Sequence, residues 1–255
     1  MDKIKILGVP IDRVTMREAV ARTVEALSND KKFFIVTPNS EIVFHANKDK
    51  KLHTIIEKAD MVVPDGIGLV IGSKIVGKPL NERVTGIDLM ENLLKYADES
   101  GKSIYLIGGK EGVAQEAGFN IKEKYKNLKI AGTHHGYFKG SHTGHPNSKE
   151  ETLAIEHLNA ANPDIVFVAL GAPRQEFFID SNIEKMNGKV FMGVGGSLDV
   201  YSGKVNRAPK IYQNLGLEWL YRLIQEPWRF KRMSALPLFL IYVLLKRDKS
   251  INRSD

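Results

Sequence analysis

Short apolar runs alternate along this chain with longer segments whose apolar residues recur at helical spacing. The runs are rich in β-branched residues and end at Gly, Pro, Asn or Asp, which is typical of buried strands. We expect strands at 4–9, 33–37, 60–64, 103–107, 128–133, 164–170 and 189–194. Helices are expected at 16–28, 40–47, 66–76, 86–100, 111–125, 149–161 and 177–186, with a short one ending near 58. This alternation predicts an α/β fold, Rossmann-like, with a mostly parallel sheet sandwiched by helices. The order of the strands stays open.

The pattern changes after residue 203. Apolar residues recur at helical spacing from Ile211 to Ile224, Pro227 interrupts them, and an apolar run fills 236–245. About 20 apolar residues are needed to span a bilayer, so this run is too short to cross one. We therefore divide the chain into an α/β core at 1–203 and a basic, amphipathic C-terminal appendage at 204–255.

The net charge of +7 comes entirely from the appendage, where 11 Lys and Arg face four Asp and Glu. Arg222, Arg229 and Arg232 fall in one sector of a helical wheel if the break at Pro227 is allowed for. Basic residues beside Trp and apolar faces favour a segment that lies in the membrane interface. The alternative is a helix packed on the protein's own core or on a subunit partner.

Polar side chains lie at the ends of three of the expected strands. Thr37 and Asn39 lie at the end of the strand at 33–37, Asp65 follows the strand at 60–64, and Arg174 with Gln175 follow the strand at 164–170. In an open α/β sheet, ligands bind at the carboxyl ends of strands. Together with Arg83 on a polar connection, these residues suit transfer of a group from an anionic leaving group. Asp65 would accept a proton, and the arginines would balance charge. The alternatives are ordinary structural roles: Asp65 as a helix N-cap, turn formation around Pro38, and a solvated first helical turn.

Two glycine turns open helices and offer backbone N–H groups to a diphosphate, namely Gly108-Gly109 and Gly195-Gly196 with Asp199 nearby. The spacing at Gly108 is not G-x-G-x-x-G, which argues against a nicotinamide cofactor but leaves a nucleotide-dependent oxidoreductase as an alternative. No Asp-x-Asp pair or cysteine offers a metal site, and the histidines of 134–145 are expected in a solvated loop. A third possible function, after group transfer and oxidoreduction, is an adaptor without catalysis, which uses the basic appendage to bind a membrane or nucleic acid. Without an apolar leader at its start, the chain is expected in the cytoplasm.

Several longer motifs resemble the WecG/TagA/CpsF glycosyltransferases along nearly the whole chain. They are Thr37-Pro38-Asn39, Pro64-Asp65-Gly66-Ile67-Gly68, Arg83-Val84-Thr85-Gly86, Gly171-Ala172-Pro173-Arg174-Gln175-Glu176, Gly195-Gly196-Ser197-Leu198-Asp199, the segment 203–209, Leu217-Glu218-Trp219 and Pro227-Trp228-Arg229.

The resemblance implies an inverting, metal-independent enzyme without a cofactor. It would move N-acetylmannosamine from UDP-N-acetylmannosamine to the C4 hydroxyl of N-acetylglucosamine on an undecaprenyl diphosphate, in wall teichoic acid linkage-unit synthesis. Another UDP-sugar, such as the uronic acid, is the alternative donor. The resemblance also implies self-association and attachment to the inner face of the cell membrane, with no nucleic acid partner.

The resemblance assigns roles to single residues. Asp65 would be the base, and Thr37 would help to position the substrates. The sugar or diphosphate would contact Asn39, Arg83 and Gln175, with Gly171 and Arg174 beside them. The glycine turns and Asp199 would hold the nucleotide. Lipid phosphates would meet Arg222, Arg229 and Arg232.

Overall fold

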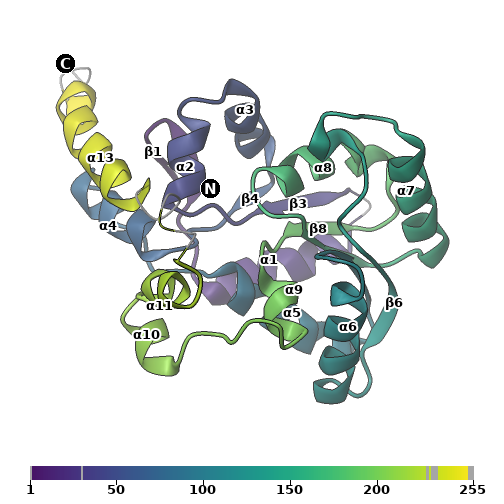
Figure 1. Ribbon diagram of the computed structural model, residues 1–255. Coiled ribbons are helices and arrows are strands. Elements are labelled where there is room, and N and C mark those ends of the chain that lie inside the picture. The colour runs from purple at the N-terminus through teal and green to yellow at the C-terminus, as the bar shows by residue number, and fades with distance from the viewer. Residues whose placement is uncertain (1, 30, 228–229, 231–234, 252–255) are drawn as a thin grey trace.

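The computed structural model describes residues 2–29, 31–227, 230 and 235–251. Its centre is a parallel sheet with the strand order β4-β3-β8-β7-β5-β6 (Figure 1). The strands are β3 (Phe33–Val36), β4 (Met61–Val62), β5 (Ser103–Gly108), β6 (Lys129–His134), β7 (Ile165–Ala169) and β8 (Val190–Gly193). The predicted α/β fold with a mostly parallel sheet is confirmed.

Helices cover both faces of this sheet. They are α1 (Met16–Leu27), α2 (Ser40–Ala46), α3 (Lys50–Lys58), α4 (Ile67–Ile75), α5 (Gly86–Ser100), α6 (Val113–Lys124), α7 (Lys149–Ala161), α8 (Arg174–Asn182) and α9 (Ser197–Tyr201). Short 3-10 helices lie at η1 (Ser141–Thr143) and η2 (Ile183–Lys185). After the core come α10 (Lys210–Asn214), α11 (Glu218–Gln225) and α13 (Ala235–Ile251).

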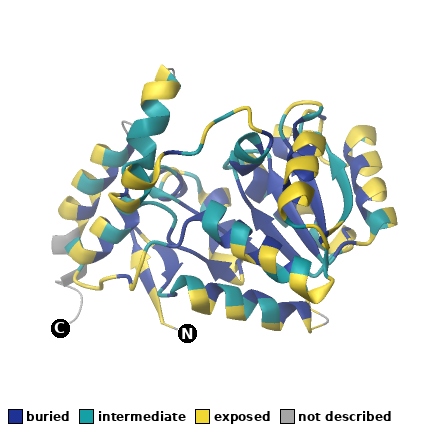
Figure 2. Ribbon diagram, turned by 90° about the horizontal axis from the view of Figure 1, so that it is seen from below, coloured by how far each residue is buried: buried dark blue, intermediate teal, exposed yellow. Residues whose placement is uncertain are grey.

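Two hydrophobic cores lie on opposite faces of the sheet, because successive strand side chains point to opposite sides. Along β7, Ile165 and Phe167 join the core formed with α1, α5 and α6, whereas Val166 and Val168 join the core formed with α2, α3, α7 and α8. All of β7 and β8 is buried, and the exposed residues are on the outer faces of the helices (Figure 2). This two-sided burial is why the strands read as continuous apolar runs.

The single strand expected at 4–9 is wrong. The structure has a hairpin there, β1 (Lys3–Ile6) and β2 (Val9–Asp12), which forms a separate antiparallel sheet. Its two-residue turn places Leu7 at φ 50° and Gly8 at φ 86°. Positive φ at both central residues gives the twist that closes a tight hairpin. Leu is rare in such a turn, so the sequence pattern did not indicate a hairpin here.

Local capping agrees with the sequence at α1. Thr15 accepts a hydrogen bond from the backbone N–H of Glu18, and Glu18 accepts one from the N–H of Thr15, as a capping box requires.

Helix α8 begins at Arg174, earlier than the expected 177, and continues into η2, so the polar residues after β7 lie in its first turn.

A C-terminal appendage distinct from the core is not confirmed. Helix α13 packs on α2 and α4 and buries Phe239 and Val243. Gly68 and Gly72 of α4 make this approach possible, because a Cβ on Gly68 would lie 2.6 Å from Leu236 and one on Gly72 would lie 3.0 Å from Phe239. Within the described residues, no helix has the length and hydropathy required to cross a membrane.

Candidate active site

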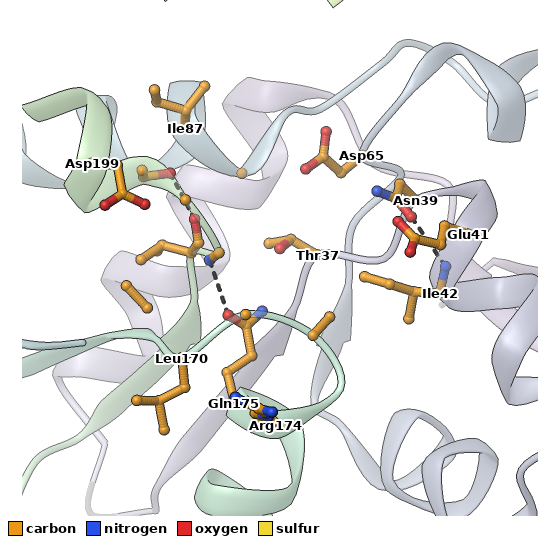
Figure 3. Close-up of a pocket in the computed structure, with 18 of the residues that line it drawn as sticks. Thr37, Asn39, Glu41, Ile42, Asp65, Ile87, Leu170, Arg174, Gln175 and Asp199 are labelled. Carbon is orange, nitrogen blue, oxygen red and sulfur yellow. Dashed lines mark hydrogen bonds between the residues drawn. The ribbon is translucent and has the colours of Figure 1, made fainter. Parts of the chain in front are cut away.

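A cavity of about 1000 Å³ opens at the carboxyl edge of the parallel sheet (Figure 3). Residues that follow β3, β4, β7 and β8 line it, and α11 contributes to its rim. It brings together most of the predicted site residues, namely Thr37, Asn39, Asp65, Arg83, Gly109, Gly171, Arg174, Gln175, Gly195, Gly196, Asp199 and Arg222. The parallel arrangement accounts for this convergence, since every strand delivers its following loop to the same edge.

Asp65 follows β4 and points into the cavity. Its backbone N–H donates to Pro38 O at 3.1 Å and to Val63 O at 3.0 Å, which fixes the turn between strand and helix. The N-cap of α4 is Gly66, and no side chain caps that helix. The alternative role of Asp65 as a helix cap is therefore excluded.

The pKa of Asp65 is raised from 3.8 to about 6, chiefly because burial disfavours the carboxylate. A backbone hydrogen bond from Gly86 opposes the shift, the charge of Glu218 adds to it, and Arg222 and Arg83 oppose it. The side chain thus remains ionised at neutral pH and holds a proton more readily than an exposed aspartate. This is the property of a general base.

Thr37 and Asn39 lie close to Asp65 at the end of β3. Thr37 Oγ1 donates to the carbonyl of Gly193 at 2.9 Å, so the hydroxyl ties β3 to β8 and keeps its oxygen as an acceptor. Asn39 caps α2 through Oδ1, which accepts from the N–H of Ile42 at 3.0 Å. The Nδ2 amide of Asn39 remains as a donor at the cavity wall.

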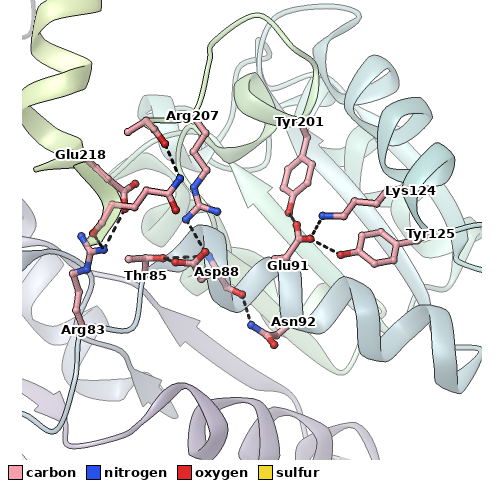
Figure 4. Close-up of polar contacts among 12 residues, drawn as sticks. Arg83, Thr85, Asp88, Glu91, Asn92, Lys124, Tyr125, Tyr201, Arg207 and Glu218 are labelled. Carbon is pink, nitrogen blue, oxygen red and sulfur yellow. Dashed lines mark hydrogen bonds and ion pairs between the residues drawn. The ribbon is translucent and has the colours of Figure 1, made fainter. Parts of the chain in front are cut away.

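Arg83 connects the cavity to the segment after residue 203. Its Nη2 donates to Gln213 O at 2.7 Å and lies 3.3 Å from Glu218 Oε1 (Figure 4). Nearby, Arg207 pairs with Asp88 in the first turn of α5 at 2.6 Å. These contacts place α11 at the cavity rim, where its Arg222 carries positive charge toward Asp65.

The two glycine turns differ in their relation to the cavity. Gly195 and Gly196 line it, and a Cβ on Gly196 would lie 3.6 Å from Arg222 Nη1 and 3.7 Å from Asp199 Oδ2. Gly109 also lines it, whereas Gly108 does not. A Cβ on Gly108 would lie 2.3 Å from Ala169 O, so this glycine allows β5 and β7 to approach each other.

Gln175 and Arg174 occupy the first turn of α8, next to Gly171. Arg174 is exposed and lines the cavity. Gln175 is buried, and both ends of its amide bind protein groups: Oε1 accepts from the N–H of Gly195, and Nε2 donates to Glu176. The amide of Gln175 is therefore held in place by the protein and forms part of the cavity wall.

Sequence reasoning gave no role to Glu218 and Trp219, which also line the cavity. His142 lines it too and is only 6% exposed, so the expectation that this histidine lies in a solvated loop is wrong. Glu218 and Arg222 are four residues apart and share a helix face, a spacing that would have placed them together. Among the residues that the structure describes, no three His, Cys, Asp or Glu side chains gather as a metal site. Arg229 and Arg232 lie outside the described residues.

The cavity combines the carboxyl group of Asp65 with cationic side chains, whereas the N–H groups of Gly109 and Gly195 at the glycine turns already donate to Ala169 O and Gln175 Oε1. Such a set accepts a proton from an attacking hydroxyl and stabilises a departing anion. This chemistry fits transfer of a sugar from a nucleotide diphosphate.

Comparison with known proteins gives the same indication. The model of the glycosyl transferase WecG/TagA/CpsF family matches residues 4–253. The N-acetylglucosaminyldiphosphoundecaprenol N-acetyl-beta-D-mannosaminyltransferase of Bacillus spizizenii is 39% identical over 218 residues, which cover 86% of this chain and 81% of that protein. The protein of the same name from Staphylococcus aureus is 34% identical over 254 residues, which cover 99% of this chain and 96% of that protein. This chain therefore belongs to the WecG/TagA/CpsF family and is a glycosyltransferase.

Proposed function

We propose that this enzyme transfers N-acetylmannosamine from UDP-N-acetylmannosamine to the C4 hydroxyl of N-acetylglucosaminyl-diphospho-undecaprenol. Two relatives that match most of the chain carry this acceptor and this sugar in their names. The product would be the linkage unit of wall teichoic acid.

The observation that carries the proposal is Asp65, a carboxylate in the cavity whose pKa is raised to about 6. In the proposed step, Asp65 accepts the proton of the C4 hydroxyl while that oxygen attacks C1 of the donor sugar. The bond from C1 to the diphosphate breaks, and UDP leaves with the bonding electron pair. A single displacement of this kind inverts the anomeric centre.

The charge of the leaving diphosphate would be balanced by protein groups. Lys110 and Arg174 line the cavity, as do Arg83 and Arg222, whose charges oppose the rise in the pKa of Asp65. Arginine forms paired hydrogen bonds with phosphate oxygens, which suits this role without a metal ion. Thr37 and Asn39 would orient the sugars.

The lipid acceptor requires contact with a membrane surface. Exposed apolar side chains on α11 and α13 favour such contact, among them Ile224, Leu238, Ile241 and Leu245. Lys and Arg predominate in the same segment and would attract anionic lipids. Peripheral attachment at the cytoplasmic face and self-association remain predictions.

The proposal is tested by release of UDP in the presence of a short-chain N-acetylglucosaminyl-diphospho-lipid. We expect release to require the acceptor, to persist in EDTA and to fall by a factor of about 10²–10⁴ in Asp65→Asn. Asp60→Asn is the matched control, because Asp60 stands at the opposite end of β4 and binds the N–H of Phe34 at 2.8 Å. Full activity of Asp65→Asn would exclude the proposed base, and activity only with a uronic acid donor would exclude the proposed sugar.

A further inference from the structure

A buried carboxyl group to which the proposed transfer gives no role lies directly behind the cavity wall. Glu176 is 1% exposed and follows Gln175, which is 2% exposed and lines the cavity. Both residues belong to the first turn of α8. A glutamate side chain is rarely buried this completely without a specific reason.

The orientation of the Gln175 amide is fixed by its partners. The backbone N–H of Gly195 can only donate, and it lies 2.9 Å from Gln175 Oε1 (Figure 3). The other end of the amide is therefore the nitrogen, and it donates to Glu176 Oε1 at 2.9 Å. Glu176 thus holds the amide nitrogen of Gln175, and the amide oxygen of Gln175 in turn holds the backbone N–H of Gly195.

The segment from Gly193 to Gly195 is held from two sides. Thr37 donates to the carbonyl of Gly193 from one side. On the other side the Gln175 side chain packs so closely that a Cβ on Gly193 would lie 2.5 Å from Nε2. A movement of Gln175 would therefore move the turn that carries Gly195 and Gly196 at the cavity.

The surroundings of Glu176 favour its neutral form. Burial raises its pKa to about 7, although hydrogen bonds from Gln175 and from its own backbone N–H act in the opposite direction. Oε2 is buried and has no hydrogen-bond partner among the described residues. An ionised carboxylate would leave that oxygen charged and without a donor, at a high cost.

We infer that Glu176 is a positioning residue for the proposed transfer: its carboxyl group accepts the amide hydrogen of Gln175 and so holds the Gly195-Gly196 turn in the shape that receives the donor's diphosphate. This inference rests on the proposed function, because it assigns the turn to a nucleotide diphosphate. Glu176 itself does not touch the substrate.

Three variants separate support of Gln175 from simple packing. Glu176→Met fills a similar volume without an acceptor, Glu176→Asp withdraws the acceptor by one methylene, and Glu176→Gln keeps a neutral acceptor for Gln175 Nε2. We expect Glu176→Met to raise the KM for the UDP-sugar and the Kd for UDP about tenfold, as one lost hydrogen bond does, with little change in kcat. Glu176→Asp should show a smaller rise in both constants, and Glu176→Gln should match the wild type.

The control variant is Asp164→Ala, at the opposite edge of the sheet. Asp164 precedes β7 and accepts hydrogen bonds from Ser103 and Lys102 at 2.8 and 3.0 Å. Its loss should lower the melting temperature without raising the Kd for UDP. Calorimetric titration with UDP and thermal unfolding are measured on every variant.

Each outcome bears on one claim. A wild-type enzyme that does not transfer the sugar contradicts the proposed function. A wild type that transfers, together with Glu176→Met and Glu176→Asp that lose stability but keep the KM and the Kd for UDP, overturns the positioning role alone. If Glu176→Met does not fold, the comparison of Glu176→Asp with Glu176→Gln decides, because both keep a polar side chain.

Discussion

Replacing Asp65 with asparagine should stabilise the protein while it lowers activity by a factor of about 10²–10⁴. The reason is the raised pKa of Asp65, about 6 in the folded chain against 3.8 for an ordinary aspartate. The folded state binds the proton more tightly, so the carboxyl costs no stability below pH 4. The cost grows as the pH rises from about 4 to about 6 and is complete above that range.

The difference of about 2.2 pKa units corresponds to about 3 kcal/mol at 1.36 kcal/mol per unit. About half of this cost is present at pH 5 and nearly all of it at pH 8. Asparagine carries no charge and avoids the cost, but it accepts the backbone hydrogen bond of Gly86 less strongly than a carboxylate does. We therefore expect a gain of about 1–3 kcal/mol at pH 8 and a smaller gain at pH 5.

Urea unfolding followed by far-UV circular dichroism at pH 5 and pH 8 measures this gain. Asp60→Asn is the control, since Asp60 is exposed and binds the N–H of Phe34. It should show no stabilisation at either pH. The reasoning would be refuted if Asp65→Asn were no more stable than the wild type at pH 8, or if its gain did not grow with pH.

Further predictions concern pH and the groups around the cavity. The value of kcat/KM should fall as the pH drops through about 6, because Asp65 then holds a proton; a flat profile from pH 5 to 8 would exclude it as the base. Glu218→Gln should shift this fall to lower pH, because the charge of Glu218 raises the pKa of Asp65; an unchanged or opposite shift in the same assay would contradict this. Glu151→Gln should lower the free energy of unfolding by about 1–3 kcal/mol at pH 7, measured by urea titration. Burial opposes ionisation of Glu151, but hydrogen bonds from Ser141, Asn147 and Asn182 outweigh it and lower its pKa. The contribution of the carboxylate to the free energy of unfolding should therefore disappear in acid. An equal loss of stability in Glu151→Gln at pH 4 and pH 7 would argue against this.

Much of the fold follows from the sequence because its physical causes are local. Strands buried on both faces leave continuous apolar runs, and the capping box at Thr15 and Glu18 requires two residues three positions apart. The position of Asp65 follows from the same logic, since the apolar run that ends at Pro64 contains β4 and delivers the next side chain to the sheet edge.

Other features depend on contacts between distant segments. The strand order and the ion pair of Arg83 with Glu218 join residues whose sequence neighbourhoods say nothing of each other. The apolar run at 236–245 fits both a membrane surface and a protein core, and only packing on α4 shows that Phe239 and Val243 are covered by the chain itself. The internal bonding of Gln175 likewise depends on the position of Gly195.

The most direct test of the central claim is identification of the product. The wild-type enzyme is incubated with UDP-N-acetylmannosamine and a water-soluble N-acetylglucosaminyl-diphospho-lipid, and the lipid is examined by mass spectrometry and NMR. We predict addition of one N-acetylhexosamine in β linkage to the C4 oxygen, and addition slower by a factor of about 10²–10⁴ with Asp65→Asn. An α linkage, another linkage position or an unchanged lipid would contradict the proposed transfer.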